Sequence, residues 1–250
     1  MQFLNLKIGQ RVPDAKTIWH FKNELAQAGM IEKLFNKLHT QLVADGIIVN
    51  KGSIVDASFV NVPKQRNSRS ENEQIKDGEQ PGDWSEEKAR QKDTDARWTK
   101  KNDETHYGYK DHIKADMDTK LITGFEVTDA SVHDSQALDK LLTEEDKVVY
   151  ADSAYRSEAQ EKRLEQKNIE SRIIEKGYRD NPLTKRQIQR NKKKSKKRVR
   201  VEHIFGFMHN SMNGMFIRCI GKVRAKAAIG MRNLVYNFCR LTQLNIELSS

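Results

Sequence analysis

Two runs of apolar residues at helical spacing open the chain. In the first, Ile18, Phe21 and Leu25 share one face, and Asp14 is placed to cap the N-terminus of the helix. The apolar face of the second run consists of Leu34, Phe35, Leu38 and Leu42. A glycine follows each run and predicts where the helix ends. The pattern predicts a helical hairpin that must pack on another part of the chain.

Strand-like segments dominate the middle of the chain. Runs rich in β-branched and aromatic residues predict strands at 46–50, 52–60, 105–118, 121–132, 147–155 and 169–177. The third and fourth of these segments read as a β-hairpin, with its turn in the sequence DMDTK. Short helices are expected at 133–145, capped by Asp134, and at 157–168, capped by Ser157.

Two amphipathic helices complete the pattern. The first, at 200–212, has apolar positions at Val201, Ile204, Phe205, Met208 and Met212. The second, at 225–244, has its apolar face at Ala227, Met231, Leu234, Phe238 and Leu241. The order of elements is strand, insertion, two strands, helix, strand, helix, strand, helix. This order predicts an α/β fold, in which helices cover both faces of a mixed sheet.

A polar segment at 63–106 interrupts the strands. Between residues 64 and 104, 21 of 41 residues are charged, and Trp84 and Trp98 are among the few large apolar ones. Such a composition provides little surface for a core. The sequence therefore predicts a mobile insertion after the first strand of the sheet.

The excess of positive over negative charge lies in one stretch of the chain. The net charge is +10, and residues 184–201 contain ten Lys or Arg and no acid. The rest of the chain is balanced, with 35 basic and 35 acidic residues. A basic block of this kind favours a polyanion, and the common cytosolic polyanion is nucleic acid. The alternative is a solvated basic tract without a partner.

Several classes of protein are disfavoured by composition. The mean hydropathy is −0.81, and no apolar run approaches the roughly 18 residues of a membrane span. The N-terminal sequence lacks the apolar core and cleavage site of a signal peptide. Cys219 and Cys239 lack metal-ligand spacing, which indicates reduced core thiols in a cytosolic protein.

Two acids interrupt strand-like segments. Asp152 follows the apolar run in KVVYADSAYRS, and Asp56 lies within SIVDASFV. A buried carboxylate is costly unless it is paired. A single buried Asp is more often a hydrogen-bonded structural residue, but two acids on strands of one sheet favour a shared site.

Glu202 is the third candidate acid. It lies on the helix at 200–212, next to Val201, and Arg198 precedes it by four residues. The alternative is a surface ion pair between Arg198 and Glu202. Three carboxylates in one place repel each other unless a cation is present, and oxygen ligands suit Mg²⁺ or Mn²⁺. Two such ions about 4 Å apart activate an attacking oxygen and stabilise a leaving oxygen at a phosphodiester.

Six segments together resemble a known protein family. They are VPDAKTIWHF, IVDASFVNVPK, YGYKDHIKAD, VTDASVHDSQAL, YADSAYRS and RVRVEHIFG. In this order they resemble bacterial insertion-sequence transposases of the DDE type, in the IS-four/IS-five-like group. The resemblance covers nearly the whole chain and implies an RNase H-like core. It also implies that Asp56, Asp152 and Glu202 are the catalytic acids, and that they bind two Mg²⁺ or Mn²⁺ ions.

The resemblance also implies contacts with DNA. The expected phosphate-binding residues are Lys110, Arg156, Lys192, Lys193, Lys194, Lys196, Lys197 and Arg198. The implied partners are the terminal inverted repeats of the element and the target DNA, bound by a homodimer. The implied location is the bacterial cytoplasm, at the nucleoid. The family's Tyr and late Lys positions on the third-acid helix hold Ser195 and His209 here, which departs from its DNA-contacting pattern.

The start of the chain is the second departure. The resemblance divides the chain into a helical N-terminal remnant at 1–47 and a catalytic domain at 48–250. MQFLNLKIG resembles the interior of the family's end-recognition region. We hypothesise a truncated or split reading frame. The absence of matching coding sequence upstream of Met1 would contradict the split-frame version.

Two other functions stay open on the sequence alone. An RNase H-like nuclease would use the same acids to hydrolyse DNA without strand transfer. An inactive transposase remnant would bind DNA without cleaving it. The presence of all three acids argues against the remnant, and a strand-transfer assay separates the nuclease from the transposase.

Overall fold

The computed structural model describes residues 12–244. Residues 1–11 and 245–250 lie outside the described residues, and with them the first part of the predicted N-terminal remnant. Within the described range the strands are β1 (Ser53–Asn61), β2 (Arg97–Lys101), β3 (Glu104–Asp116), β4 (Ile122–Asp129), β5 (Val148–Tyr150) and β6 (Glu170–Ser171). The helices there are α1 (Ala15–Gln27), α2 (Met30–Ala44), α3 (Arg69–Lys76), α4 (Glu86–Arg90), α5 (Ser135–Leu141), α6 (Glu158–Gln166), α7 (Lys185–Arg198), α8 (Arg200–Ser211) and α9 (Lys222–Gln243).

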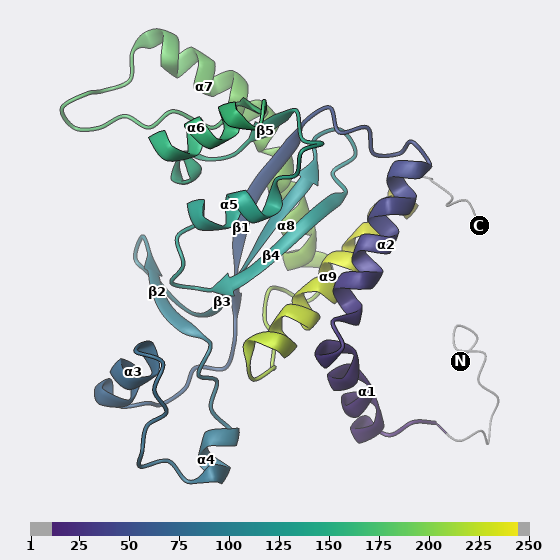
Figure 1. The fold of residues 1–250 in the computed structure, drawn as a ribbon, viewed down its shortest axis with the longest axis vertical. Coiled ribbons are helices and arrows are strands. Elements are labelled where there is room, and N and C mark those ends of the chain that lie inside the picture. Colours follow the sequence, from purple (N-terminus) through teal and green to yellow (C-terminus); the bar gives the residue numbers. More distant parts are fainter. Residues whose placement is uncertain (1–11, 245–250) are drawn as a thin grey trace.

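One mixed sheet organises the fold (Figure 1). The central strand β1 pairs antiparallel with β3 and parallel with β5. On the outer side of β3, its first part pairs with β2 and its second part with β4, both antiparallel. On the other side of the sheet, β5 pairs parallel with β6. The predicted hairpin and the predicted mixed sheet are both confirmed.

Helices cover both faces of the sheet, as predicted. Neighbouring residues of β1 show the two layers, because successive side chains of a strand point to opposite faces. Ile54 belongs to the larger core, which includes Phe35 of α2, Ile204 of α8 and Leu234 of α9. Val55 belongs to the smaller core, which α5 and α6 supply. The α/β fold class and its RNase H-like arrangement are therefore confirmed.

The predicted apolar faces of the first and last helices are partly wrong. Ile18 and Phe21 of α1 are 47% and 62% exposed, because α1 is buried mainly near its end, at Ala26. In α9, Met231 and Phe238 are largely exposed, and the buried surface includes polar residues instead. Burial of the amide at position 237 is possible because Asn237 exchanges two hydrogen bonds of 2.8 Å with the backbone of Ile122.

The prediction of a mobile insertion at 63–106 is wrong. The segment forms α3, α4 and β2, and β3 already begins at Glu104. Trp84 is buried, and its indole N–H donates to Glu71 at 2.5 Å. The buried carboxylate of Asp93 accepts hydrogen bonds from the Tyr109 hydroxyl at 2.8 and 2.9 Å. Polar contacts, rather than an apolar core, order this segment.

Three strand predictions are wrong or too long. Residues 46–50 form no strand, because the N–H groups of Ile47 and Ile48 bond to the Leu42 carbonyl and close the end of α2. Strands β5 and β6 have three and two residues, far fewer than predicted.

Cys219 and Cys239 are free and half-buried. No helix in residues 12–244 has the length and apolar character needed to cross a membrane.

Candidate active site

The parallel pairing of β1 and β5 brings the first two predicted acids together. Ile54 is opposite Tyr150, and Asp56 and Asp152 each follow this pair by two residues, close enough for the charge of Asp152 to raise the pKa of Asp56. Asp152 caps a short 3₁₀ helix, and its Oδ1 accepts the N–H of Ala154 at 2.8 Å. Oδ1 of Asp56 accepts the N–H of Ala57 at 2.9 Å. Backbone donors therefore orient both carboxylates at the same edge of the sheet.

Arg198 connects the third acid to this pair. Its Nη1 donates to Asp56 Oδ2 at 2.8 Å, and its Nη2 donates to Glu202 Oε1 at 2.9 Å. The side chains of Arg198 and Asp56 are only 21% and 19% exposed, whereas Glu202 is 57% exposed. The helix ion pair considered from the sequence is thus present. It is one half of a bridge that extends across the site.

Burial dominates the electrostatics of Asp56. It raises the pKa of this carboxyl to about 6, and the nearby carboxylate of Asp152 adds to the rise. The N–H of Ala57 and the guanidinium of Arg198 act in the opposite direction. A carboxyl group in this environment is stabilised in its charged form by a nearby cation.

A buried polar layer lies on the other face of the sheet. Lys110 donates to Asp134 Oδ1 at 2.8 Å and to the carbonyl of Val132 at 2.7 Å. Asp134 is the N-cap residue of α5, as predicted, but its side chain makes no capping hydrogen bond and binds Lys110 instead. Tyr155 is fully buried, its hydroxyl has no hydrogen-bond partner in the described part of the chain, and burial raises its pKa well above the usual range.

Sequence reasoning overlooked Tyr155 and the inward role of Lys110. The negative charges of Asp134, Asp56 and Asp152 also raise the pKa of Tyr155. The available signal was the position of Tyr155 three residues after Asp152, in YADSAYRS. For Lys110 there was none, because its partner is 24 residues away.

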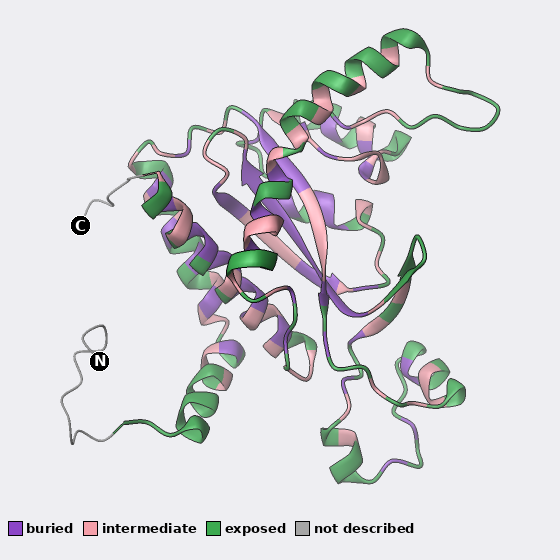
Figure 2. Cartoon of the chain, turned by 180° about the vertical axis from the view of Figure 1, so that it is seen from behind, coloured by how far each residue is buried: buried purple, intermediate pink, exposed green. Residues whose placement is uncertain are grey.

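The predicted DNA-binding residues divide into paired and free groups. Arg156 forms an ion pair with Glu161, and Lys194 donates to the carbonyl of Ile173 and lies 3.6 Å from Glu175. Four lysines of α7 are exposed and have no ion pair among residues 12–244: Lys192, Lys193, Lys196 and Lys197. Figure 2 shows α7 extending from the body of the protein, exposed along most of its length.

The donor chemistry of the three acids fits a divalent cation, because carboxylate oxygens are the ligands that Mg²⁺ and Mn²⁺ prefer. Within residues 12–244, however, no three acidic, His or Cys side chains converge as a ligand set. Arg198 explains this, since its guanidinium contacts both Asp56 and Glu202.

Comparison with known proteins identifies the class to which this fold and site belong. The transposase DDE domain family matches residues 49–238. The chain therefore belongs to the DDE-domain transposases, which confirms the resemblance seen in the sequence.

One curated relative is the transposase for insertion sequence element IS1106 of Neisseria meningitidis serogroup B. It is 30% identical over 224 residues, which cover 88% of this chain and 76% of the relative. Among solved structures, a piggyBac transposase synaptic complex with hairpin DNA matches with a TM-score of 0.42 and 10% identity. That match covers 80% of this chain and 49% of the other.

Proposed function

We propose that this chain cleaves and joins DNA strands at the ends of an insertion sequence, with Asp56, Asp152 and Glu202 as its catalytic acids. The observation that carries the proposal is the pairing of Ile54 with Tyr150, because Asp56 and Asp152 each follow this pair by two residues. The Arg198 bridge supports the inclusion of Glu202. The bound cofactor is Mg²⁺ or Mn²⁺, in two copies.

The residues of the chain have distinct roles in this reaction. Asp56 and Asp152 provide carboxylate oxygens whose orientation is fixed by the N–H groups of Ala57 and Ala154. Glu202 completes the ligand set from α8. The divalent ions, when bound, supply the positive charge that favours an attacking oxygen and stabilises a leaving one. Arg198, once released from the acids, lies where a DNA phosphate approaches them.

The exposed lysines of α7 hold the DNA backbone. Lys192, Lys193, Lys196 and Lys197 recur at helical spacing, so they present their charges along one side of the helix. Each phosphate contact is weak, but several together make binding steeply dependent on salt. Lys110 has a different role in this proposal. It is 11% exposed and ion-paired with Asp134, so it supports the sheet beneath the acids.

The reaction requires neither a covalent protein intermediate nor an external energy source, because one phosphodiester is exchanged for another. Transposition joins two element ends, so we further propose that two copies of the chain act together on DNA in the bacterial cytoplasm.

The test is cleavage of a linear duplex that carries the end of the source element, with Mg²⁺, Mn²⁺ or EDTA. We expect metal-dependent nicking at the element boundary for the wild type and none for Asp152→Asn or Glu202→Gln. DNA binding by Asp152→Asn should be unchanged or tighter, because a charge that repels phosphate is removed. Asp103→Asn is the matched control, since Asp103 is fully exposed on the insertion.

Comparable cleavage by Asp152→Asn would refute the assignment of the acids. Nicking without joining to a target plasmid would favour the RNase H-like nuclease. Salt-sensitive binding without cleavage in either metal would favour a protein that only binds DNA.

A further inference from the structure

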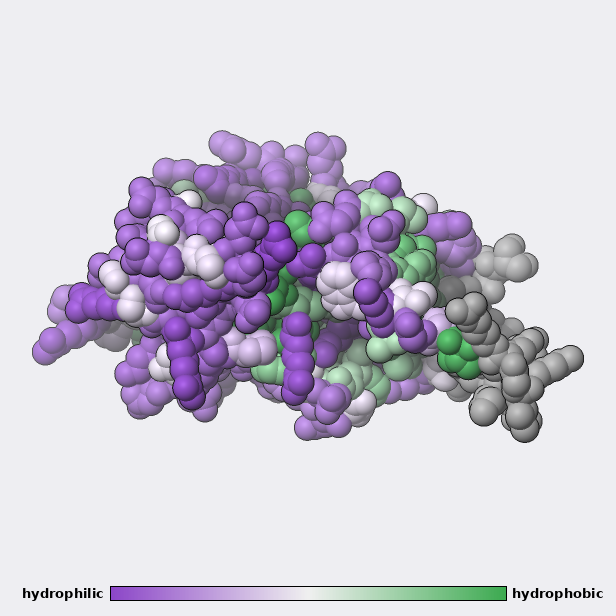
Figure 3. Space-filling view, turned by 90° about the horizontal axis from the view of Figure 1, so that it is seen from below, coloured by the Kyte–Doolittle hydropathy of each residue, from purple (hydrophilic) through white to green (hydrophobic). Residues whose placement is uncertain are grey.

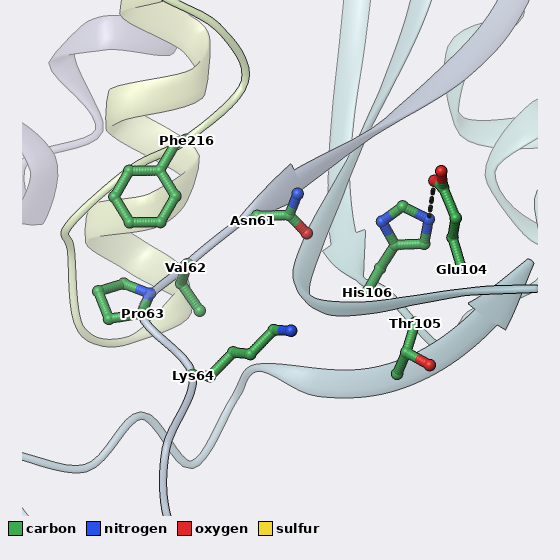
Figure 4. A pocket seen from close by; sticks show the side chains of 8 residues that line it. All are labelled: Asn61, Val62, Pro63, Lys64, Glu104, Thr105, His106 and Phe216. Atoms are coloured by element: carbon green, nitrogen blue, oxygen red, sulfur yellow. Dashed lines mark ion pairs between the residues drawn. The ribbon is translucent and has the colours of Figure 1, made fainter.

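A pocket lies where β1 ends, away from the acids. Its volume is about 450 Å³. The residues that shape it are Asn61, Pro63, Lys64, Thr105, His106 and Phe216. Figure 4 shows the rings of Phe216 and His106 on opposite sides, with the Lys64 ammonium extending between them. The transposition chemistry proposed above makes no use of this pocket.

Backbone hydrogen bonds hold the pocket rigidly. The N–H of Asn61 donates to the Met215 carbonyl at 2.9 Å, and the N–H of Ile217 donates to the Asn61 carbonyl at 3.0 Å. Phe216 is therefore fixed on both sides by pairing with the end of β1. Its ring is nevertheless 43% exposed. The Phe216 side chain is therefore accessible to a ligand.

Cations accompany the aromatic rings around the pocket. The Arg218 guanidinium lies 5.9 Å from the centre of the Phe216 ring, and the Lys64 ammonium lies 5.9 Å from that of Trp98. Trp98 itself is 40% exposed. His106 stacks on Phe59 with the ring centres 4.0 Å apart and an angle of 8° between the planes.

Figure 3 shows the surface at the end of the molecule that carries the insertion and α1. It is mainly hydrophilic, and apolar residues show near its middle (Figure 3). Exposed rings interleaved with Lys and Arg are the features by which proteins bind unpaired nucleotides, because bases stack on the rings while the cations hold the phosphates. Asn61 and Thr105 add polar groups for the edge of a base. Glu104, which also lines the pocket, is 3.8 Å from His106 and largely solvated.

The distance from the acids fits a nucleotide near the reacting phosphate. Asn61 lies five residues beyond Asp56 on β1, which at about 3.3 Å per residue is about 17 Å. This corresponds to about five nucleotides at ~3.4 Å each. We infer that the pocket between Phe216 and His106 binds an unpaired base of the DNA strand, within about five nucleotides of the reacting phosphate. The inference rests on the proposed function, because it requires DNA at the acids.

The test compares two DNA probes in EDTA, where no cleavage occurs. One is a duplex with a five-nucleotide single-stranded overhang, and the other is the same duplex with a blunt end. Fluorescence anisotropy gives the affinity of the wild type, Phe216→Ala and Phe238→Ala. Phe238 is the matched control, since it is 48% exposed on α9 and outside the pocket.

We expect the wild type and Phe238→Ala to prefer the overhang about tenfold, and Phe216→Ala to lose that preference while its affinity for blunt DNA is unchanged. A 2-aminopurine base in the overhang should be quenched by the wild type and not by Phe216→Ala. Equal affinity of the wild type for both probes would overturn the inference, and so would equal losses on both probes in Phe216→Ala.

Failure of this inference is distinguishable from failure of the proposed function. Cleavage at the element end without any overhang preference would leave the proposed function intact and refute the base pocket. An overhang preference that depends on Phe216, in a protein that does not cleave, would support the pocket and count against the catalytic assignment.

Discussion

The two ion pairs of Arg198 should contribute very unequally to the stability of the protein. The Arg198–Asp56 bond is 2.8 Å long, between side chains that are both about four-fifths buried. A charged hydrogen bond in such a place contributes about 2 kcal/mol. The Arg198–Glu202 bond has a similar length, but Glu202 is 57% exposed. Solvent screening reduces an exposed pair at this helical spacing to about 0.4 kcal/mol.

Double-mutant cycles measure these two contributions separately. One cycle combines Arg198→Met with Asp56→Asn, and the other combines Arg198→Met with Glu202→Gln. The free energy of unfolding is obtained from urea titrations in EDTA at pH 8, where Asp56 is ionised. We expect a coupling of about 2 kcal/mol in the first cycle and below about 0.5 kcal/mol in the second.

Two further observations decide whether the reasoning is sound. Burial raises the pKa of Asp56 to about 6, so its coupling to Arg198 should shrink at pH 5, where the carboxyl is protonated. Couplings of equal size in the two cycles would refute the view that burial of Asp56 determines the strength of the bridge. A coupling to Asp56 that is the same at pH 5 and pH 8 would refute its ionic nature.

Two other predictions concern stability and DNA binding. Burial raises the pKa of Asp111 to about 7, above the ~3.9 of an unfolded chain, so stability should fall as the pH rises from 4 to 7. Asp111→Asn should remove that slope and stabilise the protein at pH 8 by at most about 4 kcal/mol; an unchanged slope in urea titrations would contradict this. Replacing the four free lysines of α7 with Gln should reduce the slope of log Kd against log salt by about 3. An unchanged slope in anisotropy titrations would place the DNA elsewhere. The lysines are Lys192, Lys193, Lys196 and Lys197.

Much of the sheet was predictable because its strands have clear local sequence signals. The hairpin of β3 and β4 has long runs of strand-forming residues and a polar turn, and both strands appear as expected. The insertion was not predictable in the same way. Its order depends on contacts such as Trp84 with Glu71 and Tyr109 with Asp93, which span 13 and 16 residues. Composition measures how much apolar surface a segment has, but not which polar groups find partners.

The candidate site shows the same division. Asp56 and Asp152 were conspicuous because each is an acid within an apolar segment, and each follows the paired residues Ile54 and Tyr150 by two positions. The bond between Arg198 and Asp56 joins residues 142 positions apart, which no local pattern reveals. Glu202 was a candidate acid because it lies next to apolar residues on an amphipathic helix. The sequence left open whether it belonged to a site or to a surface ion pair.

The bridge shows that these two readings of Glu202 are compatible, since the ion pair connects it to the site. It also links the two charged regions of the molecule. Arg198 is the last residue of the basic helix α7, and α8 with Glu202 begins two residues later at Arg200. Val199 between them keeps helical backbone angles, with φ −52° and ψ −19°. The proposed DNA-binding lysines and the arginine that bridges Asp56 and Glu202 therefore lie on one helix, α7, directly before the helix that carries Glu202.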